Sequence, residues 1–283
     1  ELYTESFKLF EETLGIDFQE IIGYSSDATI DIVDSYSGAW AGSYSILSGK
    51  TGWSLVNVSE NWANYYGTGY GTYLIQTIHH EICHALGLGH QGDYNGSASY
   101  GIDESFSNDS WQMSIMSYFS QSENISVDAS SIYLMTPSAV DWLALEKIYG
   151  KYHYGTSNAF LGDTVYGFNT NISNKTSKIW SQFATFIDRN AFCIVDGSGN
   201  DTVDLSEFTD NQNIDLRPAD INSFNIYSSD VAGLKGNLHF APNTFIERVI
   251  SGTGDDSLIG NKKNNILDGG AGDDTMSGGA GDD

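Results

Sequence analysis

The sequence predicts two domains of different fold class. Residues 1–150 are expected to form an α/β (α+β) domain with a mixed, mostly parallel sheet, because a helix, several strands and a second helix follow one another there. Residues 151–283 are expected to form an all-β domain, because short β patterns separated by turns lead into a nine-residue repeat. A chain of 283 residues is long enough for two hydrophobic cores, and the change of pattern places the boundary near Gly150.

The first element is a helix. Apolar residues recur at helical spacing and a glycine follows the last of them: Tyr3, Phe7, Phe10, Leu14 and Gly15. Four extended patterns come next, at residues 16–21, 28–33, 38–44 and 52–58. The third of these is short and bounded by glycine, which suits an edge strand. A glycine-rich loop then leads into a second helix, a long polar loop follows it, and residues 137–149 form a third helix that Gly150 ends.

The second helix carries the pattern H-E-x-x-H-x-x-G-x-x-H. His80 and His84 are four residues apart, so both imidazoles leave the same helix face and can share one metal ion. Glu81 lies about 100° further round the helix, where it can reach a metal-bound water. Gly87 allows a left-handed turn that brings His90 back as a third ligand. Three neutral nitrogens leave a fourth tetrahedral position open, which is typical of a catalytic zinc site.

The alternative is a helix whose histidines only satisfy hydrogen bonds within a core. An apolar stripe already lies roughly opposite His80 and His84, and it consists of Leu74, Ile78, Ile82 and Ala85. The helix therefore has a face to bury without using its histidines. His79 points elsewhere and is expected to be structural.

Composition restricts the classes of partner. Lys and Arg number 12 and Asp and Glu 37, so the net charge is −25, which argues against nucleic acid and anionic membranes as partners. Cys83 and Cys193 cannot form a disulfide scaffold and are expected to be free, buried thiols. The sequence has no run of 18 apolar residues, which argues against a transmembrane helix. The chain opens directly into a helical pattern, as a processed form or a fragment would.

The repeat begins at Ser251, with units at residues 251–259, 260–268, 269–277 and 278–283. The sixth position holds Asp256, Asn265, Asp274 and Asp283, and the eighth holds Leu258, Leu267 and Met276. This pattern is typical of a calcium-binding parallel β-roll, in which units two apart stack on the same side. Asp256 is therefore expected to share a Ca²⁺ with Asp274, and Asn265 to share a weaker one with Asp283. The alternative is a flexible acidic tail, but the strict period and the apolar eighth position favour calcium.

Together these residues resemble the serralysins, which are secreted bacterial metzincin proteases with a calcium-filled repeat domain. The resemblance extends over essentially the whole chain. After the zinc motif, residues 114–118 resemble the family's methionine turn, which implies that Met116 lies beneath the zinc. Tyr118 matches a tyrosine that ligates the resting zinc and swings to stabilise the transition state. Cys83 departs from the family, in which glycine is common at that position, and Gln91 stands where proline is usual.

The resemblance also implies structural calcium ligands. Residues 162–169 resemble the family's opening of the second domain, and residues 196–204 resemble its first calcium loop. The ligands implied for this loop are Asp196 and Asp201, with Phe160, Gly162, Thr164 and Gly199 nearby. Glu247 matches a glutamate that binds a neighbouring calcium.

The function expected from these residues is that of a secreted zinc endopeptidase. Glu81 would act as general base toward a zinc-activated water, and Tyr118 would stabilise the oxyanion. An extended polypeptide substrate would pair with the edge strand at Ala39, Trp40 and Ala41. The family implies extracellular localisation by one-step type I export, and a monomer whose partners are peptide or protein substrates and a proteinaceous inhibitor. An N-terminal segment and a C-terminal secretion region of the family are expected to be missing.

Two other functions remain open. A non-catalytic calcium module with a relic zinc site is one, although a relic has little reason to keep Glu81 with all three ligands. A zinc hydrolase acting on something other than peptides is the other, and the metzincin layout disfavours it.

Overall fold

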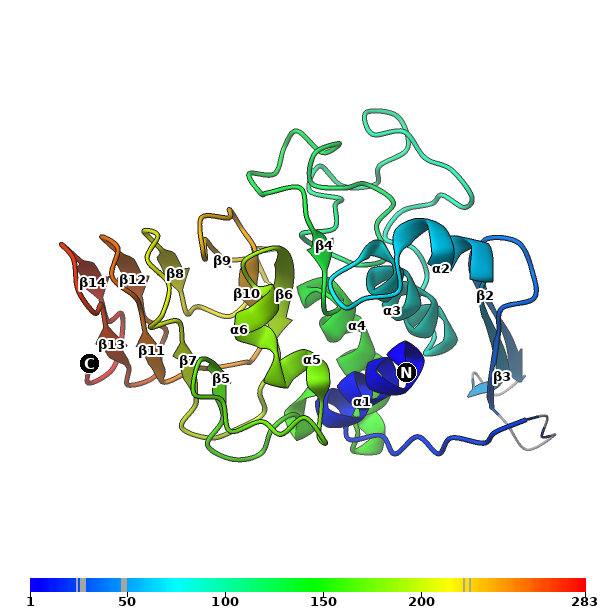
Figure 1. The fold of residues 1–283 in the computed structure, drawn as a ribbon, viewed down its shortest axis with the longest axis horizontal. Coiled ribbons are helices and arrows are strands. Elements are labelled where there is room, and N and C mark those ends of the chain that lie inside the picture. Colours follow the sequence, from blue (N-terminus) through cyan, green and yellow to red (C-terminus); the bar gives the residue numbers. More distant parts are fainter. Residues whose placement is uncertain (24, 26–28, 47–49, 221, 224) are drawn as a thin grey trace.

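The computed structural model describes residues 1–23, 25, 29–46, 50–220, 222–223 and 225–283. Its elements form one elongated body (Figure 1). The sheet of β1 (Ile30–Val33), β2 (Ala39–Ile46) and β3 (Lys50–Val58) lies at one end, and the short C-terminal strands lie at the other. The helices α1 (Leu2–Leu14), α3 (Tyr73–Ala85) and α4 (Ala139–Tyr149) stand between them.

The helix α1 begins and ends where the sequence predicts. Leu9, Phe10 and Leu14 are fully buried, and Gly15 ends the helix with φ +69°. A prediction that fails is the strand at residues 16–21, because no strand forms there. Phe18 instead folds back onto α1: its amide donates to the Glu11 carboxylate at 2.9 Å, and its ring packs on Phe7 with centroids 5.0 Å apart. Phe18 is therefore packed against α1 and not against a neighbouring strand.

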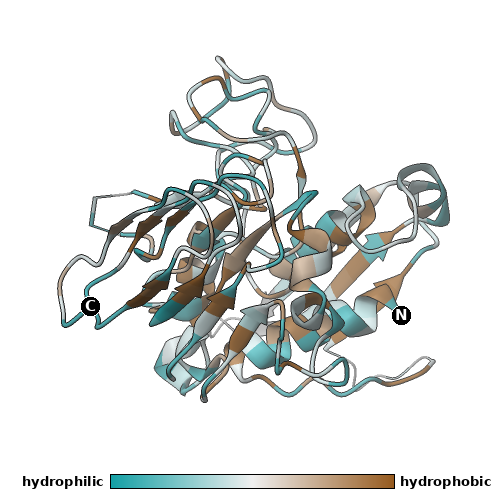
Figure 2. Ribbon diagram, turned by 60° about the vertical axis from the view of Figure 1, so that its left-hand side comes forward, coloured by the Kyte–Doolittle hydropathy of each residue, from teal (hydrophilic) through white to brown (hydrophobic). Residues whose placement is uncertain are grey.

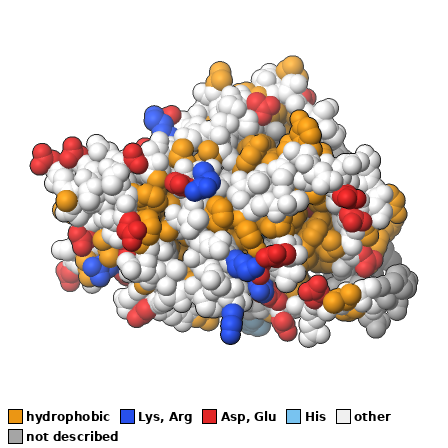
Figure 3. Space-filling model, in the orientation of Figure 1, with side chains coloured by type: hydrophobic (Ala, Val, Ile, Leu, Met, Phe, Trp, Pro, Cys, Tyr) orange, Lys and Arg blue, Asp and Glu red, His pale blue; other side chains and the backbone are white. Residues whose placement is uncertain are grey.

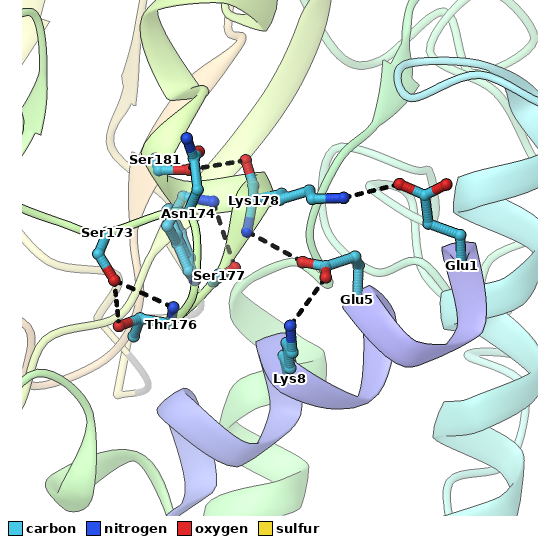
Figure 4. Close-up of polar contacts among 10 residues, drawn as sticks. Glu1, Glu5, Lys8, Ser173, Asn174, Thr176, Ser177, Lys178 and Ser181 are labelled. Carbon is cyan, nitrogen blue, oxygen red and sulfur yellow. Dashed lines mark hydrogen bonds and ion pairs between the residues drawn. The ribbon is translucent and has the colours of Figure 1, made fainter. Parts of the chain in front are cut away.

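Charged residues connect α1 to the C-terminal part of the chain (Figure 4). The Glu5 carboxylate accepts from the Lys8 ammonium at 2.9 Å and from the backbone amide of Lys178 at 3.1 Å. Lys178 is the first residue of the short helix α5 (Lys178–Ser181), and its ammonium donates to the Glu1 carboxylate at 2.6 Å. Glu5 is buried, so its carboxylate binds the start of α5 directly to α1.

The N-terminal sheet has the order β1-β3-β2. β1 is parallel to β3 and β2 is antiparallel to it, so the described sheet is mixed, with one ladder of each kind where a mostly parallel sheet is predicted. β2 lies at an edge of this sheet, as the sequence predicts, and the pattern at 28–33 begins within residues outside the described ones. Ser54 of β3 donates to the carbonyl of Ala85, which holds the sheet against the end of α3.

One feature of this half is not predicted from the pattern, and one is. A helix α2 (Glu60–Tyr66) follows β3, and the Ser59 side chain caps it by accepting from the Trp62 amide at 3.2 Å. Residues 91–132 contain no helix or strand beyond one isolated bridge between Asn95 and Ser97. The long polar loop is therefore as predicted, and it forms the tall excursion above α3 in Figure 1.

The C-terminal half contains two sheets whose strands are all parallel. One has the order β13-β11-β7-β5 and the other β14-β12-β8. The first sheet comprises β5 (Val165–Gly167), β7 (Thr202–Asp204), β11 (Arg248–Ile250) and β13 (Ile266–Asp268), and the second comprises β8 (Asn213–Asp215), β12 (Ser257–Ile259) and β14 (Thr275–Ser277). From β11 onward, successive strands alternate between the two sheets, so units two apart pair, as the repeat predicts.

The repeats stack closely because their turns are glycine. Gly270 has φ +81°, and a Cβ there would overlap the carbonyl oxygen of Gly252 in the turn beneath it. Among the eighth-position residues Leu258 is fully buried, Leu267 is partly buried and Met276 is 52% exposed. Figure 2 shows that the strands of the repeat are hydrophobic and that hydrophilic turns join them.

A third sheet lies beside the helices and has the order β4-β6-β10-β9. Its strands are β4 (Tyr133–Leu134), β6 (Asn190–Ile194), β9 (Ser228–Ser229) and β10 (Leu238–Phe240). One of the short β patterns expected after residue 150 lies at residues 179–187, and the prediction of a strand there is wrong, because α5 and α6 (Phe183–Phe186) occupy that segment. Ile179, Trp180 and Phe183 are all buried there, so an apolar run that suits a strand packs as two short helices.

The boundary predicted near Gly150 is crossed by both cores. β4 precedes it and pairs with β6, which follows it. One core cluster joins Leu9 and Ile75 to Trp180 and Phe183. The 3-10 turns at Gly150–Tyr152 and Thr156–Asn158 connect the halves without separating them. The two-domain division remains a prediction.

No helix within the described ranges combines the length and apolar character that a membrane crossing requires.

Burial predicts how the repeat responds to truncation. Leu258→Ala should lower the free energy of unfolding by about 2–5 kcal/mol, because it opens a cavity between the two sheets. Met276→Ala removes a side chain that is half exposed and should cost less than about 1 kcal/mol. Urea denaturation of both variants in saturating calcium measures the difference, and equal losses would contradict the two-sheet core.

Candidate metal centres

Three histidines converge at the C-terminal end of α3. His80 and His84 lie on one face of the helix, and His90 returns to them through the turn that begins after Ala85. Gly87 has φ +104°, as predicted, and its amide donates to the carbonyl of His84 at 3.0 Å. The atoms of His80, His84 and His90 that could ligate a metal lie within 4.8 Å of one another.

Each imidazole is oriented by a hydrogen bond to a backbone carbonyl. The Nδ1 atom of His80 lies 2.8 Å from the carbonyl oxygen of Ile115, that of His84 2.8 Å from the oxygen of Leu88, and that of His90 2.9 Å from the oxygen of Tyr94. A carbonyl oxygen can only accept, so each Nδ1 carries the proton. Each Nε2 therefore presents a lone pair to the others, which is how metal-ligating histidines are held.

The Nε2 atoms fit a cation. Those of His84 and His90 lie 3.1 Å apart, and two lone pairs that face each other at this distance repel. Burial lowers the pKa of His80 to about 3 and that of His84 to about 4, and it also lowers the pKa of His90, so all three are neutral at pH 7. Three neutral nitrogens around one point suit Zn²⁺, whose charge converts the repulsion into coordination.

Glu81 lies beside this centre and is 5% exposed. Its Oε2 atom is buried and has no hydrogen-bond partner. Burial raises the pKa of Glu81 to about 8, because the charged carboxylate is poorly solvated there. A carboxyl group placed in this way can both take up and release a proton near neutral pH.

Tyr118 and Met116 are placed by the turn at 114–118. The Tyr118 ring lies 4.4 Å from the His90 ring, and its hydroxyl accepts a hydrogen bond from the Gly96 amide at 3.2 Å. Met116 is buried in the core cluster that includes Ile82, and its carbonyl accepts from the Gln91 amide at 3.2 Å. The turn therefore contacts the histidines on one side through Tyr118 and joins the core on the other through Met116.

Asp141, which the sequence presents only as part of a helix, fixes this turn. It is fully buried and accepts hydrogen bonds from the Ser114 hydroxyl at 2.5 Å, the Ile115 amide at 2.7 Å and the Ser138 amide at 2.8 Å. The Ile115 peptide thus joins Asp141 to His80. The signal in the sequence is the capping box of Ser138 and Asp141 at the start of α4, which serves the turn as well as the helix.

A second buried aspartate, Asp109, holds the long loop. Its carboxylate accepts from the Tyr94 hydroxyl at 3.1 Å and from the Ser117 hydroxyl at 2.7 Å. Asn124 donates to the carbonyl of Asp109 at 2.7 Å. Tyr94 supplies the carbonyl that orients His90, so this network positions the third histidine. Polar residues in a loop are usually exposed to solvent, so the sequence pattern does not indicate that Asp109 is buried and holds the loop.

A cleft of about 720 Å³ opens over the histidines. It is lined by His80, Glu81 and His84 of α3 and by Ala39, Trp40 and Ala41 of β2. The predicted edge strand therefore borders the same cleft as the histidines. The hydroxyl of Ser43 in the same strand donates a hydrogen bond to the carbonyl of His84, which holds β2 against the end of α3.

The cysteines and His79 are packed in the core, as the sequence predicts. Cys83 and Cys193 are both free and fully buried. His79 is buried and packs edge-on against Phe10 at 6.0 Å.

A second group of oxygens lies at the loop before β7. Asp196 and Asp201 are buried, and the former has an Oδ1 and the latter an Oδ2 without a hydrogen-bond partner. The amide of Thr164 donates to Asp201 at 2.8 Å, and the hydroxyl of Thr164 donates to the carbonyl of Gly162 at 2.9 Å. Burial raises the pKa of both carboxyl groups. A hard cation satisfies such unpaired oxygens.

The remaining predicted ligands of this loop lie around the same oxygens. The carbonyl of Phe160 accepts from the Gly162 amide at 2.8 Å, and a Cβ on Gly199 would crowd both Gly162 O and the Asp201 carboxylate. Glu247 accepts from the Asp201 amide at 3.0 Å. The structure thus brings the implied calcium ligands together, and their role remains a prediction.

The repeat places its sixth-position residues in pairs 18 residues apart. The amide of Asp256 donates to the Asp274 carboxylate at 2.9 Å, and the amide of Asn265 donates to the Asp283 carboxylate at 2.8 Å. Asp256 is buried and its Oδ2 has no partner, whereas Asn265 accepts from Asn261 and donates to the carbonyl of Ile246. The first pair therefore keeps a free buried oxygen that Asn265 lacks, which agrees with a weaker second site.

Comparisons with known proteins identify close sequence similarity. The family described as peptidase M10 serralysin C terminal matches residues 156–283. The chain is 40% identical over 221 residues to metalloprotease AprA of Pseudomonas entomophila, covering 76% of this chain and 42% of that protein. It is 42% identical over 187 residues to serralysin C of Dickeya chrysanthemi, covering 65% of this chain and 36% of that protein.

A third relative is serralysin of Photorhabdus luminescens. The identity is 41% over 206 residues, covering 70% of this chain and 38% of that protein. The chain thus spans less than half the length of the curated relatives it matches.

The role of Asp141 can be tested by Asp141→Asn. The substitution keeps the shape but removes the charged acceptor for Ser114 and Ile115, so zinc affinity should fall by about 10–100-fold. Competition with a chromophoric chelator measures the affinity. The matched control is Asp128→Asn, whose carboxylate is exposed and pairs with Lys235 at 2.9 Å. Equal zinc affinity in the Asp141 variant and the control would refute the role.

The carboxyl pair predicts how calcium and pH act on stability. Without calcium, a raised pKa in the folded state stabilises the fold below the unfolded pKa of Asp, and this contribution is lost as pH rises through the folded pKa. The rise in Tm on adding calcium should therefore grow between about pH 5 and pH 8. Differential scanning fluorimetry with zinc kept saturating measures it. Asp196→Asn should reduce the calcium effect, and an effect independent of both pH and this substitution would contradict the prediction.

Proposed function

Because this chain belongs to the serralysin family, we propose that it is a zinc-dependent endopeptidase. The observation that carries the proposal is the convergence of three neutral Nε2 atoms beside a buried, unpaired carboxyl group. Such a centre suits metal-assisted hydrolysis, since it joins three ligands to a general base and keeps a position open. The edge strand that lines the same cleft favours a polypeptide as the substrate.

His80, His84 and His90 would hold the metal through Nε2. Zinc, when bound, supplies a positive charge that lowers the pKa of a water molecule and polarises the substrate carbonyl. The backbone carbonyls of Ile115, Leu88 and Tyr94 keep the three rings in the tautomer that this requires. The histidines act as ligands only, because their Nδ1 protons are already engaged.

Glu81 would move the proton. Its carboxylate takes a proton from the attacking water and then passes it to the nitrogen of the leaving amine. Burial favours the protonated form of the free carboxyl group, and a cation nearby favours the charged form. The two effects oppose each other, which leaves the group able to exchange protons near neutral pH.

Tyr118 would stabilise the oxyanion. Its hydroxyl already accepts from the Gly96 amide, so its own proton remains available for donation. Donation to the substrate oxygen as negative charge develops lowers the barrier, because the donor is held in place before the reaction. The contact of its ring with His90 keeps it beside the centre.

The substrate would lie extended along β2. The edge of a sheet offers unpaired backbone groups, and these pair with a peptide of almost any sequence. Ala39, Trp40 and Ala41 line the same cleft as Glu81 and the histidines, so pairing there would bring a peptide bond to the centre. The expected partners are accordingly peptides and unfolded protein segments.

Calcium would serve stability. The Asp196–Asp201 group and the Asp256–Asp274 pair each present buried oxygens without hydrogen-bond partners, and a cation at each would relieve that cost. Separate acidic side chains are visible at the end of the molecule that holds the C-terminal strands (Figure 3). We further propose that the protein is secreted, since extracellular calcium is high enough to fill weak sites. A monomeric state and sensitivity to a proteinaceous inhibitor are proposed from the family alone.

Glu81→Gln tests the mechanism. The variant should keep one zinc per chain but lose casein hydrolysis by at least about 100-fold, because the amide cannot accept the proton. Metal analysis and a chelator-sensitive casein assay measure the two properties on the same sample.

The matched control is Glu60→Gln, an exposed glutamate in the first turn of α2. It should leave both zinc content and casein hydrolysis unchanged. A Glu81→Gln protein that digests casein at the native rate would rule out this carboxyl group as the base.

A further inference from the structure

Aromatic side chains gather at the end of the cleft that lies toward the start of α3. Trp62, Tyr73 and Trp111 line the cleft there, and we call them the aromatic wall. Tyr73 lies at the centre, with its ring 6.2 Å from Trp62 and 5.7 Å from Trp111. Tyr66 and Tyr133 support it from behind, at 4.7 Å and 5.3 Å from Tyr73. Three separate segments, α2, α3 and the long loop, thus contribute to one surface.

The aromatic wall is continuous with the zinc centre. Tyr73 and His80 are seven residues apart on α3, so they lie on the same helix face about 10 Å apart along the axis. Gln76 and Thr77 lie between them and also line the cleft. About three residues of an extended peptide cover that distance. A side chain close to the cleaved bond can therefore reach the wall.

The wall offers ring surface and no charge. The indole of Trp62 donates to the Thr77 hydroxyl at 3.3 Å, and that of Trp111 donates to the carbonyl of Ser117 at 3.0 Å. Their N–H groups are therefore engaged within the protein. Among the described residues that line the cleft, no lysine or arginine occurs and Glu81 is the acidic one. A charged side chain would find no ion-pair partner at the wall.

The three rings are only half buried, whereas the large aromatic residues of the core are fully buried. Half-buried ring surface that is held rigidly and faces a cleft is what an aromatic ligand requires, because edge-to-face and offset contacts then form without further ordering.

We propose that Trp62, Tyr73 and Trp111 form a subsite that binds an aromatic side chain of the substrate close to the cleaved bond. This inference rests on the proposed endopeptidase function, because it names the side chain that such a cleft selects. Backbone pairing along β2 accepts many sequences, and the aromatic wall then sets a preference among them. Phenylalanine or tyrosine at one position should raise kcat/KM by about 10–100-fold over alanine.

The test uses pairs of internally quenched peptides that differ only by phenylalanine or alanine, placed in turn at three positions on each side of the cleaved bond. The native protein should prefer phenylalanine at one of these positions. Trp62→Ala and Trp111→Ala should each reduce that preference by about 10-fold, because each removes one ring of the wall. Trp111→Phe keeps a ring and should retain most of it.

Tyr65→Ala is the matched control. Its ring packs against Tyr66 at 4.7 Å, but Tyr65 is 81% exposed and does not line the cleft. The preference should remain as in the native protein. A native protein without preference at any position, or tryptophan variants that both keep the full native preference, would overturn the subsite.

Binding separates this inference from the proposed function. Zinc-loaded Glu81→Gln protein should bind the phenylalanine peptide at least about 10-fold tighter than the alanine peptide in fluorescence anisotropy. Selective binding without any cleavage by the native protein would refute the endopeptidase and support the subsite. Cleavage without selectivity in either assay would support the endopeptidase and refute the subsite.

Discussion

The geometry of the site depends on three hydrogen bonds, each from an imidazole Nδ1 to a backbone carbonyl. They fix the tautomer of His80, His84 and His90 and turn all three Nε2 lone pairs toward one point. Each carbonyl is placed by a different part of the fold. The turn at Gly87 places that of Leu88, Asp141 holds the Ile115 peptide, and the Asp109 network holds Tyr94. Helix, loop and turn are therefore organised around the positions of three oxygen atoms.

The same principle recurs throughout the C-terminal half. Asp196, Asp201 and Asp256 are buried with a carboxylate oxygen that no protein donor reaches, as is Glu81 beside the three histidines. Burial of an unpaired charge is costly. Cations at these places would supply the missing partners. A bound cation would then serve catalysis at the histidines and stability in the C-terminal half, with a different metal in each place.

Much of this arrangement could be predicted, because the sequence states it locally. The spacing of His80, Glu81 and His84 on one helix, the glycine that returns His90, and the nine-residue repeat all depend on neighbours in the chain. The edge strand that lines the cleft also followed from its glycine boundaries. Where local pattern and packing agree, the prediction is reliable.

The predictions that are wrong concern segments in which packing against distant residues overrides the local pattern. Residues 16–21 alternate like a strand, but Phe18 packs on α1 and no partner strand is paired with them. Residues 179–187 are rich in buried apolar side chains, which suits a buried helix as well as a strand. Asp109 and the aromatic wall depend on contacts between distant segments, which no pattern in the sequence records. The capping box at Asp141 indicates the start of its helix but not the turn that it also holds. Tertiary contact decided each of these, and the sequence shows only the residues that take part.

X-ray absorption at the zinc edge of metal-replete protein tests the central claim most directly. The account predicts one zinc per chain with three imidazole nitrogens at about 2.0–2.1 Å and a fourth light-atom ligand. Zinc bound with fewer than three imidazoles, or no zinc retained after dialysis, would contradict it.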